Sequence, residues 1–324
     1  MSGDSVSSGR PQPDGAMSAP EGITERQLRE RRYHQGHAAQ NRAIADRKPA
    51  LDILAADGRQ WWNSHWRMYD ALLAQDVRGK RVVIPGCGFG DDACRLAELG
   101  ADVYAFDISP DVVEIAKERA TRFGWAGIHF AVTPAERTDY EDDFFDAALL
   151  HGVFHHLNIE AALVELGRIL KPGALVLSHD PYTHSSLQRI RNSRFVREVL
   201  YPRMSRFIYG TDDSYLTEDE EKLNEATVAQ IAGCLSEPEV QYFCMAEGRL
   251  LPARHPLVSK LDRGVLRLLP RAGRYLGGRC VIAGALRKSP APSRVNPAPH
   301  VEPGTALDRS DHATPRVPPC SPPC

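Results

Sequence analysis

Three glycines and one aspartate stand at the ends of two neighbouring apolar segments. Residues 81–85 are largely apolar and are followed by Gly86, Gly88 and Gly90, and residues 103–106 form a second run that ends at Asp107. A strand, a glycine loop and a helix in this order place the loop and the carboxylate at one edge of a parallel sheet. Glycine allows a ligand close to the backbone, and a carboxylate accepts hydrogen bonds from ribose hydroxyls. The pattern therefore predicts a nucleotide-like ligand.

A dinucleotide fits this loop poorly. A G-x-G-x-x-G fingerprint beginning at Gly86 needs its third glycine at position 91, which is Asp91 and is followed by Asp92. Carboxylates there repel the pyrophosphate that a helix N-terminus would bind. S-adenosylmethionine carries a sulfonium and an ammonium and no phosphate, so acidic residues beside the loop suit it. The residues favour S-adenosylmethionine, and a nucleotide-dependent oxidoreductase is the alternative.

Three histidines follow the apolar run 145–150, namely His151, His155 and His156. In one interpretation His151 packs on the cofactor, and His155 or His156 packs against or caps the next helix. In the other, His155 or His156 is a general base. A hydroxyl with a pKa of about 10 must lose its proton to accept a methyl group, and imidazole suits that step near neutral pH. An acidic carbon or a carboxylate needs no base, so both interpretations stay open.

A third interpretation is that histidine and aspartate side chains at this sheet edge bind a metal ion. The candidates are His151, His155, His179, Asp180 and His184. They lack a compact ligand spacing such as H-E-x-x-H. We therefore expect no metal.

Regular elements must position these residues. Ser109 followed by Pro110 predicts a helix over 110–122, and Asn158 predicts the cap of the next helix, whose last turn includes Lys171. A turn is expected at 171–173. Further strands are expected at 128–132, 145–150, 174–177, 239–245 and 279–286.

Residues 23–78 predict helices, with breaks near Gly36 and Pro49. A helix over 61–75 carries an apolar stripe, and we interpret this stripe as core-facing. Its members are Trp62, Trp66, Tyr69 and Leu73. The alternative is that a side chain of this region closes over the cofactor, with Tyr33, His34 and His37 as candidates.

The sequence resembles the class I S-adenosylmethionine-dependent methyltransferases over about residues 60–182. The matching stretches are VVIPGCGFG (82–90), AFDIS (105–109), FFDAALLHGVFHHL (144–157) and ELGRILKPGALVL (165–177), in the family's order. The resemblance implies an α/β fold with a Rossmann-like, seven-stranded, doubly wound sheet whose last strand is antiparallel. N-terminal helices and an inserted helical cap complete this expectation. One glycine loop alone is weak evidence, whereas four stretches in register are much stronger.

The resemblance also implies the binding residues. The loop before residue 141 holds adenine in this family, commonly through an acidic side chain, for which Glu136 is the nearest candidate. The family has an acidic residue near Ile84, where this chain is apolar, and Asp91 or Asp92 could replace it. The expected cofactor-binding residues are Gly86, Cys87, Gly88, Gly90, Asp91, Asp107, Ile108, Ala135, Glu136 and His151.

Composition limits the class of protein. The chain has 324 residues, a net charge of −2 and 7 cysteines. This charge suggests no nucleic-acid partner, and the odd cysteine count without a framework spacing fits a reducing compartment, so we expect a cytoplasmic location. Residues 1–22 and 289–324 are proline-rich and predict a disordered leader and tail, and the methyltransferase domain is expected over 79–288. No apolar run is long enough to cross a membrane.

Two segments lie outside the stretches that resemble the family. Residues 183–235 alternate apolar and basic positions before an acidic stretch, and we interpret them as a helical cap over the acceptor. Residues 249–278 are basic and leucine-rich. Their apolar face either packs on the core, which we favour, or lies on an anionic membrane. The second interpretation would imply a lipophilic acceptor.

Together these features predict an S-adenosylmethionine-dependent methyltransferase that acts on an oxygen, nitrogen or carbon of a small molecule. The acceptor and the oligomeric state are open. Besides the oxidoreductase, a non-catalytic protein that binds S-adenosylmethionine is an alternative, suggested by the apolar Ile84.

Overall fold

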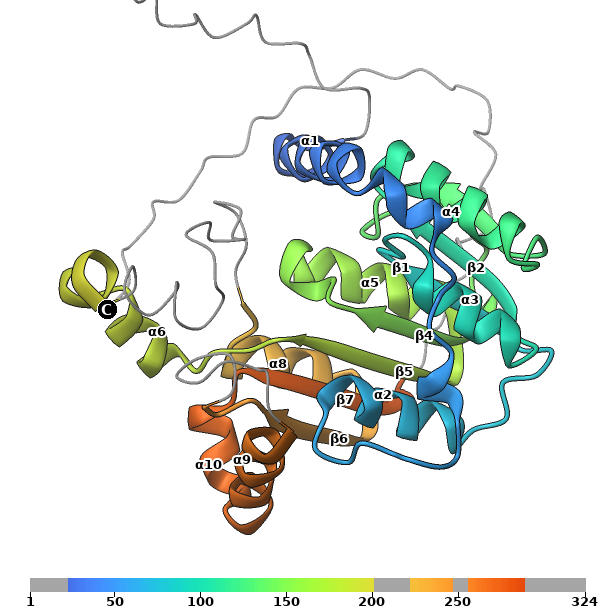
Figure 1. Cartoon of the computed structure of the whole chain (residues 1–324). Helices are drawn as coiled ribbons and strands as arrows, with labels where there is room; N and C mark the ends of the chain where they lie inside the picture. Colours follow the sequence, from blue (N-terminus) through green and yellow to red (C-terminus); the bar gives the residue numbers. More distant parts are fainter. Residues whose placement is uncertain (1–22, 201–221, 247–255, 289–324) are drawn as a thin grey trace, which may run out of the picture. The chain divides into compact units, whose positions relative to one another are not determined.

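The computed structural model describes residues 23–200, 222–246 and 256–288 (Figure 1). The expected leader, 1–22, and tail, 289–324, lie outside this range. So does the acidic part of the expected cap, within 201–221.

Seven strands form one sheet in the order β3-β2-β1-β4-β5-β7-β6. All neighbouring strands are parallel except β7, which runs antiparallel to both β5 and β6. This topology confirms the expected Rossmann-like sheet. The strands are β1 Arg81–Pro85, β2 Asp102–Asp107, β3 His129–Val132, β4 Phe145–His151, β5 Leu170–Pro181, β6 Leu235–Phe243 and β7 Arg279–Leu286.

Helices cover both faces of the sheet (Figure 1). Alternate strand residues point to opposite faces. Val82 and Ile84 join a core with α2 and α3, whereas Val83 joins a second core with α5 and α8. The helices are α1 Glu25–Gln40, α2 Ser64–Leu73, α3 Asp91–Glu98, α4 Pro110–Arg122, α5 Ile159–Ile169, α6 Ser185–Arg191, α8 Glu225–Gly233, α9 Pro256–Leu268 and α10 Pro270–Leu276. Short helical turns are η1 Arg42–Asp46, η2 Asp52–Leu54, η3 Phe154–His156 and the π-helical η4 Val196–Leu200.

Local sequence explains where two of the central helices begin. The Ser109 hydroxyl accepts the Val112 N–H at 3.5 Å, and the Asn158 side chain accepts the Ala161 N–H at 3.1 Å. Both residues are therefore the predicted N-caps.

The fifth strand is longer than predicted. It begins at Leu170, which pairs with Phe145, and the pairing resumes at Leu175 with Ala147. The extra residues between these pairs are the expected turn at 171–173, which bulges from the strand. Gly173 has a φ of +76°, which favours glycine, and Pro172 has no N–H to donate to a ladder.

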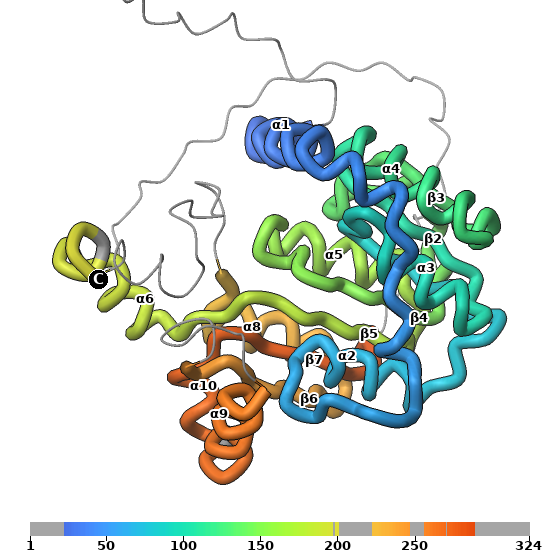
Figure 2. The backbone as a smooth tube through the Cα atoms, in the orientation of Figure 1, coloured from blue at the N-terminus to red at the C-terminus, as the bar shows by residue number. Residues whose placement is uncertain are grey.

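The two N-terminal helices pack against different parts of the domain. In α2, Trp66 and Tyr69 are buried in the first core, which confirms the core-facing interpretation for them. Helix α1 is continuous through Gly36, where a break was expected. It lies beside α4, because Ala38 packs with Val112 and Ile115 (Figures 1 and 2).

Helix α9 differs from the favoured prediction. Its apolar side chains Leu257, Leu261 and Leu268 are 60%, 71% and 83% exposed, so the core-packing interpretation is wrong for them. The helix instead buries Ser259, Asp262 and Leu266. Within the described ranges we find no helix of the length and apolarity needed to cross a bilayer.

Candidate functional site

The glycine loop after β1 has the backbone conformation that its sequence predicts. Gly86, Gly88 and Gly90 have φ angles of +62°, +51° and +81°. A Cβ atom on Gly86 would lie 2.3 Å from Cγ2 of Val153, whereas one on Gly88 would meet no atom within 4 Å. Gly86 therefore allows the tip of β4 to approach, and Gly88 offers open backbone to a ligand.

The Asp107 carboxylate at the end of β2 faces this loop. Its oxygens accept the Gly88 N–H at 3.2 Å and the Ser109 N–H at 3.0 Å. The residue is 6% exposed, and burial raises the pKa of its carboxyl despite the neighbouring His34 and these hydrogen bonds. Asp107 is thus held at the loop by backbone donors and does not turn to solvent.

The two acidic residues after the loop already have partners. Asp91 forms a bidentate ion pair with Arg119 of α4, at 2.8 and 3.0 Å. Asp92 is buried and accepts bonds from Tyr69 at 2.5 Å and Arg95 at 2.9 Å. These cationic and hydroxyl partners compensate the negative charge at the start of α3.

A group of imidazoles surrounds Asp92. His151 Nδ1 lies 2.7 Å from Asp92 Oδ2, and the His65 ring stacks on His151 with centroids 4.4 Å apart. Burial opposes protonation of His151, but the Asp92 carboxylate outweighs it and raises the pKa of this imidazole. The buried His179 bonds to Ser64 at 2.9 Å, and burial keeps its pKa well below the ordinary value. His151 is therefore the member of this group that Asp92 favours in the protonated form.

His155 has a separate carboxylate partner. Its Nδ1 atom lies 3.1 Å from Oδ1 of Asp180, which is fully buried at the end of β5 and also accepts the Ser178 hydroxyl at 2.7 Å. A buried carboxylate bonded to one ring nitrogen fixes the orientation of an imidazole.

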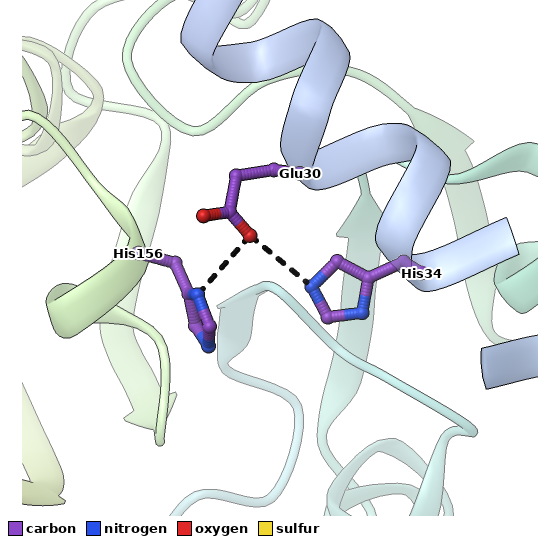
Figure 3. Close-up of side chains that lie close together, drawn as sticks. All are labelled: Glu30, His34 and His156. Carbon is purple, nitrogen blue, oxygen red and sulfur yellow. Dashed lines mark ion pairs between the residues drawn. The ribbon is translucent and has the colours of Figure 1, made fainter. Parts of the chain in front are cut away.

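His156 turns toward helix α1. Its Nδ1 atom lies 3.2 Å from Oε2 of Glu30, and the same oxygen lies 3.8 Å from Nε2 of His34 (Figure 3). The pKa of His34 is lowered, chiefly by burial. Burial raises the pKa of Glu30, but His156, His34 and Arg26 together outweigh it, and the net pKa is lowered.

Helix α1 is therefore bound across the loop and the tip of β4. The His37 ring stacks on Phe89 of the glycine loop with centroids 5.3 Å apart. Gln27 donates to Glu136 at 2.8 Å, and the other Glu136 oxygen accepts the Asn158 N–H at 3.1 Å. The expected adenine ligand Glu136 thus holds α1 and the start of α5.

Comparisons with known proteins agree with this arrangement. A family model described as a methyltransferase domain matches residues 83–178, which include the loop, Asp107 and the β4 tip. Residues 83–178 are a methyltransferase domain of the class I S-adenosylmethionine-dependent family.

Curated relatives match about half of this chain. A demethylmenaquinone methyltransferase of Tropheryma whipplei (strain Twist) is 30% identical over 166 residues, which are 49% of this chain and 66% of the relative. A ubiquinone/menaquinone biosynthesis C-methyltransferase UbiE of Brucella canis is 30% identical over 176 residues, 51% of this chain and 62% of the relative. The chain thus spans just under two thirds of these relatives.

A solved structure shares the fold. Geranyl diphosphate C-methyltransferase from Streptomyces coelicolor A3(2) aligns with a TM-score of 0.53 at 12% identity, over 82% of this chain and 100% of that one.

The other predicted cofactor-binding residues, Cys87, Ile108 and Ala135, lie in the segments that follow β1, β2 and β3. The Cys87 N–H donates to the Phe106 carbonyl at 2.9 Å, which ties the loop to β2. Ile108 directly follows Asp107, and Ala135 packs against the second core. Their contact with a cofactor stays a prediction.

Sequence reasoning missed Glu30 and Asp180 as partners of the paired histidines. The sequence pattern around Glu30 did not mark it as a functional residue, because a glutamate on a polar helix is ordinarily solvated. The sequence did mark Asp180, because this residue lies near the end of a strand at the same sheet edge as His151.

Proposed function

We propose that this chain transfers the methyl group of S-adenosylmethionine to a small-molecule acceptor. The observation that carries the proposal is the Asp107 carboxylate, held 3.2 Å from the Gly88 N–H beside a loop of left-handed glycines. Open space over Gly88 suits close approach of a ligand to the backbone. When bound, the cofactor supplies an electrophilic methyl on a sulfonium.

The chain's own residues would then bind the cofactor and orient it. Asp107 would accept the ribose hydroxyls, and the loop backbone would contact the methionine part. Ile84 leaves no acid on β1 for the ammonium, and Asp91 is engaged with Arg119. Helix α1 would cover the loop and exclude water, which favours an in-line displacement.

We assign the general-base role to His155 for an acceptor that carries a hydroxyl. Asp180 orients its Nδ1 atom, so Nε2 can take the proton as the oxygen becomes nucleophilic. His156 remains the second candidate, although its Nδ1 atom faces Glu30.

The acceptor class we propose is a lipophilic quinol. One curated relative is named a demethylmenaquinone methyltransferase, and the other is named for ubiquinone/menaquinone biosynthesis. A quinol offers both an ionisable hydroxyl and a ring carbon that becomes nucleophilic when the proton leaves. The exposed leucines of α9 would bring the enzyme to a membrane surface, where such an acceptor resides. The cysteine usage supports a cytoplasmic location.

The direct experiment incubates the full chain with S-adenosylmethionine and a prenylated 1,4-naphthoquinol. We expect release of S-adenosylhomocysteine and a product heavier by one methylene unit, both lost in Asp107→Ala. No release with quinols would reject this acceptor class. Binding without release from any cell extract would favour the non-catalytic alternative, and binding of NADH in its place would favour the oxidoreductase.

A further inference from the structure

Three side chains of the types that can bind a metal ion converge where α1 meets the turn after β4. Glu30 and His34 are one helical turn apart on α1, and His156 comes from η3, which lies opposite (Figure 3). One ligand atom from each residue lies within 4.8 Å of the other two. The fold alone creates this group, because the helix and the histidine are far apart in the sequence.

The Glu30 carboxylate lies between the two imidazoles, and its hydrogen-bonding capacity is only partly used. Its side chain is 6% exposed, and Oε2 has no hydrogen-bond donor among the described residues. The imidazole nitrogens of His156 and His34 approach this oxygen at 3.2 and 3.8 Å, and these contacts help to lower the pKa of the Glu30 carboxyl. A buried carboxylate is costly unless it is well paired, and a cation bound among the three ligand atoms would compensate its charge more fully than the two imidazoles do.

The donor set indicates which cation. Two imidazole nitrogens and one carboxylate oxygen are a known ligand set for zinc, with metal–ligand distances of about 2.0–2.2 Å. Ligands at that distance in a tetrahedral site are about 3.4 Å apart, so only small side-chain shifts are needed here. Calcium and magnesium prefer oxygen ligands and suit these histidines less well.

The second histidine group is a weaker candidate. Asp92, His65 and His151 also lie within ligand distance of one another. However, Asp92 already accepts bonds from Arg95 at 2.9 Å and Tyr69 at 2.5 Å. The guanidinium supplies the positive charge there, so this carboxylate needs no metal.

We propose that Glu30, His34 and His156 bind one zinc ion that fastens α1 over the glycine loop. The ion links two ligands on the covering helix to one on the domain beneath it. Zinc would therefore hold α1 closed. The experiment measures metal binding and not methyl transfer. The zinc proposal can therefore fail while the proposed methyltransferase function stands, and the methyltransferase function can fail while the zinc proposal stands.

The test begins with the full chain, stripped of metal by a chelator. We expect one equivalent of Co²⁺ to bind with visible d–d absorption, and Zn²⁺ to displace it. Glu30→Gln and His156→Gln should each weaken Zn²⁺ binding in calorimetry by about 100-fold or more, because even partners of metal ligands are worth 10–100-fold. His129→Gln is the matched control, since His129 pairs with Asp102 at 3.2 Å on the exposed face of β3. It should bind zinc as the wild type does.

Two further measurements guard against misfolding and test the role of the ion. Circular dichroism and urea unfolding without metal should show that the variants fold. Zn²⁺ should slow hydrogen exchange of the α1 amides in the wild type and leave it unchanged in Glu30→Gln. Failure of the wild type to bind, equal affinity in the folded variants, loss of binding in His65→Gln alone, or unchanged exchange in α1 would overturn the proposal.

Discussion

His151, the last residue of β4, places its Nδ1 atom 2.7 Å from Oδ2 of Asp92, the second residue of α3. The pair joins the helix after the glycine loop to the strand tip beside it. Because Asp92 also holds Tyr69 and Arg95, it fixes several elements around the candidate site. It serves first as a structural carboxylate.

This pair should make stability depend on pH. The folded pKa of His151 is raised, so its contribution is present below about pH 6.5 and is lost as pH rises through the folded pKa. The folded pKa of Asp92 is well below its usual value, despite burial, because of the imidazoles. Its contribution is present above about pH 3.9 and is lost as pH falls through the folded pKa.

We therefore expect His151→Gln to lower the free energy of unfolding most between about pH 4 and 6.5, by about 1–3 kcal/mol. Urea unfolding at a series of pH values measures the difference. His129→Gln, which removes an exposed pair, should change little at any pH. A deficit for His151→Gln that grows above pH 7 would contradict this account.

Two loop glycines should respond differently to alanine. Gly86→Ala combines a left-handed φ with a Cβ contact of 2.3 Å to Val153, and should cost about 2–4 kcal/mol of stability. Gly88→Ala meets only the backbone penalty, about 1–2 kcal/mol, but its methyl enters the space a ligand would use. Urea unfolding and calorimetry with S-adenosylmethionine should show greater loss of stability in the first and loss of affinity in both. Unchanged affinity in Gly88→Ala would remove that glycine from the site.

Substitutions in the His155–Asp180 pair should lower the turnover number kcat. His155→Ala and Asp180→Asn should each reduce kcat by about 100-fold or more, since general-base catalysis contributes 10²–10⁴-fold. Cofactor affinity should be unchanged in His155→Ala, and its pH–rate profile should lose its acidic limb. His156→Ala is the comparison for the second candidate base, and it too should spare cofactor affinity. If turnover survives both histidine substitutions, no general base lies here.

The exposed face of α9 should bind anionic vesicles. Leu261→Glu with Leu268→Glu should reduce co-sedimentation with phosphatidylglycerol vesicles by at least tenfold, because burying each leucine contributes about 1.5–3 kcal/mol. Val164→Glu on α5 is a matched control, since Val164 is 70% exposed elsewhere. Equal loss in the control, or no vesicle binding by the wild type, would reject a membrane contact of α9.

Sequence reasoning located the glycine loop and Asp107 because both follow short apolar strands, and the chain order of such strands determines which ends meet. It also located the caps Ser109 and Asn158, whose interactions are local. It could not find the Glu30–His156 pair, because tertiary packing alone brings α1 to the tip of β4. For α9, periodicity revealed an apolar face but not what covers it, and Leu268 proved to be 83% exposed.

Calorimetric titration with S-adenosylmethionine, on the wild type and Asp107→Ala, tests the central claim most directly. We expect saturable binding of one molecule per chain, weakened in the variant by about 1.5–3 kcal/mol, the range for a hydrogen bond to a charged group. Urea unfolding should confirm that the variant is folded. Absence of binding to the wild type, or equal affinity in both proteins, would contradict the assignment of this loop and this carboxylate as the cofactor site.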